Sequence, residues 1–336
     1  MSAFNVSPLG NKVLLGLTYA LDVADKALTW DESWWGWFGP RLRQRFIISH
    51  EGTFTVARDG IAEELPMARL RVSTLLVHNV KAPEGEVERV LASLNPFMST
   101  SALGYHPEER VIFAEFGQYV HDAWAVRRVA LAAELAPLQL LEAETMADDL
   151  AAEVCGEVSV FMPPDGVARE AVPRMIKCLS ALQEGGSLGV STYTASAEFE
   201  KLSAWAASAG LTTLTSGPDG VSFEVTLGKR AAHIGLSTAI AHPRWGPGLS
   251  LQLTLLLGWT DLAPAAEAVA SMNNRETDGL FRGQHIGAWR VVSTNGQYFL
   301  GYFVFLPNAL HIPGLTSDIT FNLVEKARWV MQLTSG

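Results

Sequence analysis

The sequence contains little of the chemistry that most kinds of site require. Only two cysteines, Cys155 and Cys178, occur among 336 residues, too few for a disulfide framework or a four-thiolate metal site, and we expect both to be reduced, buried thiols. No run of 18 apolar residues occurs, which argues against a membrane-spanning helix. Charged residues make up only 18% of the chain, and the net charge is −10. An acidic chain lacks the basic surface that nucleic-acid phosphates need, so we expect no nucleic-acid partner.

Motifs for nucleotide, metal or serine chemistry are also missing. The sequence has no Walker-type loop and no Gly-x-Gly-x-x-Gly, and none of its eight histidines has zinc-ligand spacing. Residues 185–189 spell Gly-x-Ser-x-Gly, but a helical pattern precedes this serine and β-prone residues follow it, the reverse of a nucleophile elbow. We therefore predict no catalytic residue set, no metal site and no cofactor.

Internal similarity is the strongest positive signal. Three short matches recur in the same order at a separation of 178 to 180 positions, which favours a tandem duplication. They pair Ser73–Val77 with Leu253–Leu257, Leu91–Asn95 with Val269–Asn273, and Gly117–Tyr119 with Gly296–Tyr298. We predict a first domain over 1–154, a connector with one helix over 155–195, and a second domain over 196–336.

Hydrophobic periodicity gives both halves the same order of elements. The helices expected are 11–28, 84–95 and 137–153 in the first half, 169–183 in the connector, and 198–209, 264–273 and 318–333 in the second half. The strands expected are 41–49, 53–58, 69–78, 109–116, 119–131, 221–227, 233–241, 249–257, 287–293 and 298–305. Runs of adjacent strands between helices indicate antiparallel sheets. The predicted fold class is α+β, with two tandem domains, each a curved antiparallel sheet backed by helices in the order α-β-β-β-α-β-β-α.

Four stretches of the second half occur in a recognisable order: 242–249 (His-Pro-Arg-Trp-Gly-Pro-Gly-Leu), 273–276, 285–289 and 303–308. With this order and spacing the chain resembles bacterial proteins of the YbjN-like, type III secretion chaperone-like group. The first half would be a diverged copy. The resemblance implies a curved antiparallel sheet backed by helices, dimerisation of single-domain members, and binding of partner polypeptides by the chaperones among them.

Ten tryptophans are many for this length, and two groups of residues are candidates for binding. Trp34, Trp35 and Trp37 surround Gly36, which breaks any regular period, so they serve either as binding hot spots or as packing. Insertion at a membrane surface is a third alternative, which the acidic surroundings disfavour. In the second half, a loop rich in proline and glycine and the elements after it could form one mixed aromatic and charged patch. Its members are Arg244, Trp245, Arg275, Glu276 and Trp289. Packing of Trp245 and Trp289 onto the sheet is an equal alternative.

These features favour a non-enzymatic protein-binding module, chaperone-like or a regulatory adaptor, acting as an intramolecular pseudo-dimer. Its partner would be another polypeptide, and it could form oligomers through sheet or helix surfaces. Apolar residues at helical spacing over 14–28 favour an amphipathic helix over a signal peptide, so we expect a cytoplasmic protein. Two alternatives stay open: a hydrolase-type enzyme that uses His242, His285 and Glu276 as acid and base groups, and a structural or assembly component.

Overall fold

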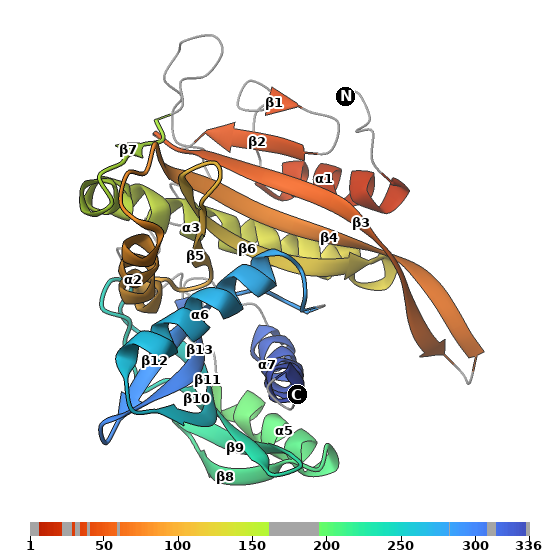
Figure 1. Ribbon diagram of the computed structural model, residues 1–336. Coiled ribbons are helices and arrows are strands. Elements are labelled where there is room, and N and C mark those ends of the chain that lie inside the picture. Colours follow the sequence, from red (N-terminus) through yellow and green to blue (C-terminus); the bar gives the residue numbers. More distant parts are fainter. Residues whose placement is uncertain are drawn as a thin grey trace. The chain divides into compact units, whose positions relative to one another are not determined.

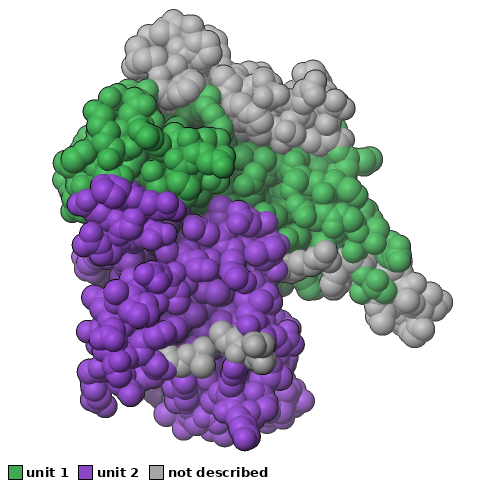
Figure 2. Space-filling view, in the orientation of Figure 1, with its two compact units in different colours: residues 1–82, 105–178 green, residues 83–104, 179–336 purple. Residues whose placement is uncertain are grey.

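The structure is a computed structural model that describes residues 7–21, 29–30, 34–38, 41–58, 61–160, 195–281, 283–307 and 314–333. The chain divides into two compact units (Figure 2). Unit 1 combines residues 1–82 and 105–178, and unit 2 combines residues 83–104 and 179–336. The segment 83–104 therefore belongs with the second half of the chain, a division that differs from the continuous domains expected from the sequence.

Unit 1 is built on an antiparallel sheet with the strand order β1-β2-β3-β4-β6-β5, to which β7 adds by pairing with β4. Two helices, α1 and α3, contact the sheet (Figure 1). Its elements are α1 (Pro8–Leu21), β1 (Thr29–Trp30), β2 (Trp34–Phe38), β3 (Arg43–Arg58), β4 (Ile61–His78), β5 (Ala102–His106), β6 (Val111–His121), the 3-10 turn η3 (Asp122–Trp124), α3 (Ala125–Glu153) and β7 (Glu157–Val158). The division between the units falls within β5.

Unit 2 contains a six-stranded antiparallel sheet with the order β12-β13-β11-β10-β9-β8. Helices α5 and α7 contact the strands β8 to β11, and α6 contacts β11 to β13 (Figure 1). Its elements are α2 (Glu84–Leu94), the 3-10 turn η2 (Asn95–Phe97), α5 (Ala195–Ser208), β8 (Thr212–Gly217), β9 (Gly220–Leu227), β10 (Arg230–Ser237), β11 (Gly248–Trp259), α6 (Leu262–Thr277), β12 (Ala288–Thr294), β13 (Gln297–Pro307) and α7 (Leu315–Leu333).

The two sheets have the same connectivity, and the predicted α+β class with antiparallel sheets is confirmed. In each, a long fourth strand (β4 or β11) pairs with the second strand of the later hairpin (β6 or β13). A helix, α2 or α6, precedes that hairpin. The end of this helix carries a repeated detail: the side chain of Asn95 bonds both the N–H and the C=O of Leu103, and Asn273 does the same to Trp289.

The sequence matches that suggested the duplication superpose only in part. Asn95 and Asn273 occupy equivalent places, as their hydrogen bonds show. Ser73 and Leu253 lie on equivalent strands, but Leu253 is fully buried whereas Ser73 is half-buried and pairs with Arg45 and Glu115. A shift of one residue moves a side chain to the opposite face of a sheet. The match at Gly117 is coincidental, since Gly117 lies inside β6 and Gly296 lies in the β12–β13 turn.

Several predicted elements require correction. Residues 119–131 are not one strand: β6 ends at His121, η3 follows, and α3 begins at Ala125 with Pro137 in its interior. The expected strands 41–49 and 53–58 form one strand, β3, with a register shift between His50 and Thr53. Strands β1, β2, β5, β7 and β8 were not predicted from the sequence. Cys155 is exposed rather than buried.

Three predictions cannot be compared with the structure. Cys178, the predicted helix 169–183 and the Gly-x-Ser-x-Gly stretch 185–189 lie outside the described residues.

Within the described part of the chain, no helix has the combination of length and apolar composition that crossing a membrane requires.

Candidate functional site

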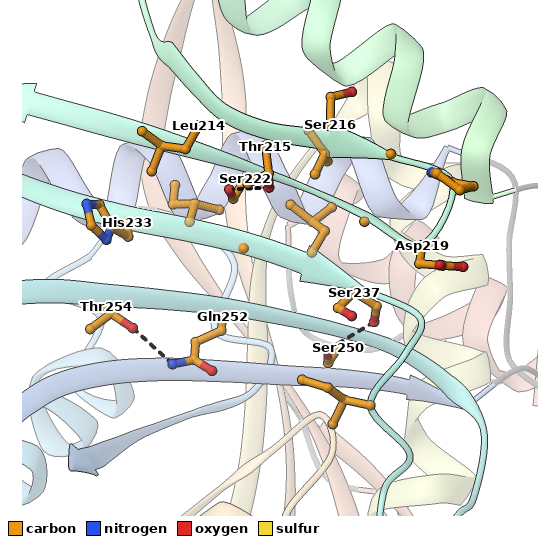
Figure 3. A pocket seen from close by; sticks show the side chains of 18 residues that line it. Leu214, Thr215, Ser216, Asp219, Ser222, His233, Ser237, Ser250, Gln252 and Thr254 are labelled. Carbon is orange, nitrogen blue, oxygen red and sulfur yellow. Dashed lines mark hydrogen bonds between the residues drawn. The ribbon is translucent and has the colours of Figure 1, made fainter. Parts of the chain in front are cut away.

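A groove lies on the face of the unit 2 sheet formed by the outward residues of β9, β10 and β11. Along these strands buried and less buried residues alternate, so Phe223, Ile234 and Leu251 lie in the core while their neighbours face outward. Those neighbours are short or polar, and they line a cavity of about 570 Å³ together with β8 (Figure 3). The lining of the floor includes Ser222, Gly235, Ser237, Ser250, Gln252 and Thr254.

Hydrogen bonds between the lining residues fix several of the polar groups in the groove. Thr215 and Ser222 share a hydroxyl–hydroxyl bond of 2.7 Å, and the Ser250 hydroxyl donates to the backbone oxygen of Ser237 at 3.0 Å. Gln252 Nε2 donates to Thr254 Oγ1 at 2.9 Å (Figure 3). The floor therefore presents oriented hydroxyl and amide groups, which can both donate and accept hydrogen bonds.

Apolar side chains stand at the border of the groove. Leu214 is 46% exposed and lies on β8 where the register with β9 shifts between Thr213 and Thr215. Ile240, in the loop after β10, is 51% exposed. A polar floor bordered by exposed leucine and isoleucine suits a ligand that combines backbone-like polar groups with apolar side chains.

The loop 238–247 packs onto the same face of the sheet. His242 and Gly246 exchange backbone hydrogen bonds of 2.8 and 2.9 Å, and Gly246 has a φ of 67°, which favours glycine. The His242 ring lies 4.9 Å from the Phe305 ring, and its Nδ1 accepts the N–H groups of Arg244 and Trp245. Burial lowers the pKa of His242 to about 4, so the ring is neutral at pH 7.

The opposite, helix-covered face holds a buried ionic cluster. Glu276 accepts hydrogen bonds from Trp289 Nε1 at 2.7 Å and from the Lys326 ammonium, and His285 Nε2 lies 3.7 Å from its other oxygen. The Lys326 ammonium lies over the rings of Phe281 and Tyr302, at 4.3 and 4.2 Å from their centroids. Burial outweighs the effect of Glu276 and lowers the pKa of Lys326 to about 8. A buried ion pair in this setting positions α6, β12 and α7.

The sheet divides the patch expected from the sequence. Trp245 is only 9% exposed and packs with His242 on the groove face, with the Arg244 guanidinium 5.9 Å from its ring centre. Trp289 and Glu276 are buried in the cluster on the other face. Arg275 is exposed on α6. Trp34, Trp35 and Trp37 lie in β2, whose backbone pairs with β3, but their side chains lie outside what the structure describes.

Of the three residues of the enzyme alternative, the structure brings together only two. His285 lies beside Glu276, and the side chains of the two are 5% and 1% exposed. His242 packs against Phe305 on the groove face. The described residues bring no three histidine, cysteine, aspartate or glutamate side chains into a metal-binding cluster.

The residues of the groove were not among the candidates predicted from the sequence. In the strands predicted over 221–227 and 249–257, the positions between the apolar residues include Ser222, Ser250, Gln252 and Thr254. The signal was therefore a row of outward positions occupied by hydroxyl and amide side chains.

Comparisons with known proteins add nothing to this geometry, because no family model, curated protein or solved structure matches the chain.

Proposed function

We propose that the protein is a non-catalytic binding module, chaperone-like in its action, that holds an extended segment of another polypeptide in the unit 2 groove. The observation that carries this proposal is the groove itself, a cavity of about 570 Å³ floored by short polar side chains on the open face of a sheet. The proposal belongs to the class of function expected from the sequence, and it assigns the proposed binding to the unit 2 groove.

The dimensions and chemistry of the groove favour an extended polypeptide. Four strands, β8 to β11, span about 15 Å at about 4.8 Å per strand, which an extended chain crosses in about five residues. The hydroxyls of Ser222 and Ser250 and the amide of Gln252 can pair with peptide N–H and C=O groups. Leu214 and Ile240 can contact apolar side chains of the same segment.

The test fills the groove without disturbing the sheet. A Cβ added to Gly235 meets no atom within 4 Å, and a strand interior favours an aromatic residue over glycine. We therefore expect Gly235→Tyr to fold normally and to block the groove. Gly85→Tyr is the matched control, because Gly85 is exposed on α2 and its added Cβ also meets nothing within 4 Å.

The measurement is selection of binders from a phage-displayed library of random peptides on the immobilised full-length protein. The affinities of the selected, fluorescently labelled peptides are then measured by polarisation. We expect Gly235→Tyr to weaken binding at least tenfold and Gly85→Tyr to leave it unchanged. Failure to select any peptide, or equal affinity for both variants, would contradict the proposal.

A further inference from the structure

Arg290 lies next to the groove on the same face of the sheet. The register pairs Arg290 of β12 with Gly301 of β13, and Gly301 with Thr254 of β11, which lines the groove. The Arg290 side chain crosses β13 to β11, where its Nη2 donates to Gln252 Oε1 at 3.0 Å. On the way its guanidinium lies over the Phe303 ring, 4.0 Å from the ring centre.

The charge of Arg290 has no counter-ion among the described residues. No carboxylate there lies within 4 Å of its guanidinium, and its Nε–H is buried without a hydrogen-bond partner. In contrast, Arg41 is paired with Glu144 and Asp148, and Arg328 with Glu325. Burial lowers the pKa of Arg290 to about 10, which leaves it charged at pH 7. Withdrawing a cation from water without an anion is costly, so a ligand that supplies the anion gains affinity.

The neighbours of Arg290 hold it in place for a ligand. Stacking on Phe303 fixes the plane of the guanidinium. Gln252 accepts from Arg290 through Oε1 and donates to Thr254 through Nε2, so this chain of hydrogen bonds joins Arg290 to the groove floor. Among the described residues the planar guanidinium donates only through Nη2, to Gln252, and a guanidinium matches the two oxygens of a carboxylate.

We propose that Arg290 is an anion subsite of the groove that binds a carboxylate of the polypeptide segment held there. This inference rests on the proposed function and adds to it the charge of the ligand. A single guanidinium neutralises a monoanion, whereas phosphate groups recruit several donors and cations. The carboxylate can come from an aspartate or glutamate side chain or from a chain terminus, and the experiment separates these two sources.

The first test measures the subsite without any peptide. The Nε–H signal of Arg290 is assigned in the NMR spectrum of the full chain by its loss in Arg290→Met. We expect N-acetylaspartate amide at millimolar concentration to shift this signal and N-acetylasparagine amide to leave it in place. Arg290→Met keeps an unbranched apolar side chain over Phe303, so its unfolding curve should resemble that of the unsubstituted protein. If the aspartate probe does not shift the signal, the subsite is overturned, whatever the peptide selection yields.

The second test uses the peptides selected on the groove. We expect Arg290→Met to weaken their binding about tenfold, the scale of one charge-assisted hydrogen bond, and to abolish the preference for carboxylate-bearing peptides. Replacing Asp and Glu of the peptide by Asn and Gln tests the side-chain source, and C-terminal amidation tests the terminus. Peptides that are blocked by Gly235→Tyr but indifferent to Arg290→Met and to both replacements would overturn the subsite and leave the proposed function standing.

Discussion

At the scale of single residues, the buried polar groups of unit 2 show where the sheet's two faces differ. On the helix-covered face Glu276 and Lys326 form an ion pair, so each charge has its counter-ion within the cluster. On the groove face Arg290 lies without a carboxylate among the described residues, and His242 stays neutral because burial opposes its charge. The groove face thus holds a cation, Arg290, for which the described residues provide no anion.

The neutral state of His242 makes stability depend on pH. Burial lowers the pKa of His242 to about 4, from the 6.5 of an unfolded chain. The backbone oxygen of Phe97 raises this pKa and the charge of Arg244 lowers it, but both effects are smaller than that of burial. Between these values the unfolded chain binds a proton that the folded protein does not. The free energy of unfolding therefore rises with pH in this window, and we expect a loss of about 3 kcal/mol as pH falls from 6.5 to 4.

Urea unfolding at a series of pH values checks this effect. In His242→Asn the amide oxygen can still accept the N–H groups of Arg244 and Trp245, which His242 Nδ1 now accepts, but nothing titrates at this position. We expect the variant to lose less stability than the unsubstituted protein between pH 6.5 and 4. His50→Asn, at an exposed position, serves as the control and should keep the full slope. Parallel curves for His242→Asn and the unsubstituted protein would show that His242 is not the titrating group.

At the scale of elements, Asn95 and Asn273 hold the hairpin strands to the helices that precede them. Asn273 lies in the C-terminal part of α6, and its amide satisfies the N–H and C=O of Trp289 at 2.9 and 3.2 Å. We expect Asn273→Ala to lower the free energy of unfolding by about 2–4 kcal/mol, because it leaves two buried backbone groups without partners. The neighbouring Asn274 is exposed, so Asn274→Ala should change stability by less than about 0.5 kcal/mol.

The same substitution at Asn95 tests the repeat. Asn95→Ala removes the equivalent bonds to Leu103, and we expect a loss of similar size in urea unfolding. A cost at Asn273 with none at Asn95 would mean that only one copy of the motif contributes to stability.

Elements with strong local signals were predictable from sequence. The helix 84–95 differs by one residue from α2, and Asn295 and Gly296 both have the positive φ of a tight hairpin turn, 50° and 73°. The segment 119–131 was misread because its apolar residues near Val126 fit a strand as well as a helix. Strand β8 was not predicted because its six residues are all exposed and show no apolar alternation.

The groove was only partly predictable, for a different physical reason. Alternation identifies which residues of a strand face away from the core, but it did not single out Gln252 or Thr254. Whether an outward face is covered depends on where α5 and α7 pack, which is a tertiary contact that local pattern does not encode. The same holds for Arg290, whose partners Gln252 and Phe303 are distant in sequence.

At the scale of the whole molecule, the segment 83–104 is a structural part of unit 2 although residues 105–178, which belong to unit 1, separate it from the rest of that unit in the sequence. Helix α2 contacts α6, and η2 contacts β12. Backbone bonds extend this packing, since Phe305 donates to the oxygen of Ser99 at 2.8 Å and Gly287 to that of Thr100 at 2.9 Å. A fragment cut at the domain boundary expected from sequence, 196–336, therefore lacks an element that its own sheet and helix need.

This arrangement can be tested by reconstitution. We expect the fragment 196–336 alone to unfold at lower urea concentration than unit 2 does in the intact chain. A synthetic peptide of residues 79–106 should bind the fragment and raise its midpoint, because binding to the folded state stabilises it by mass action. A peptide carrying Val87→Asp and Leu91→Asp is the control, since these are the buried apolar side chains of α2 and a charge there cannot be buried without cost. If the fragment alone is as stable as the intact unit, or if both peptides act equally, the segment 83–104 is not an integral part of unit 2.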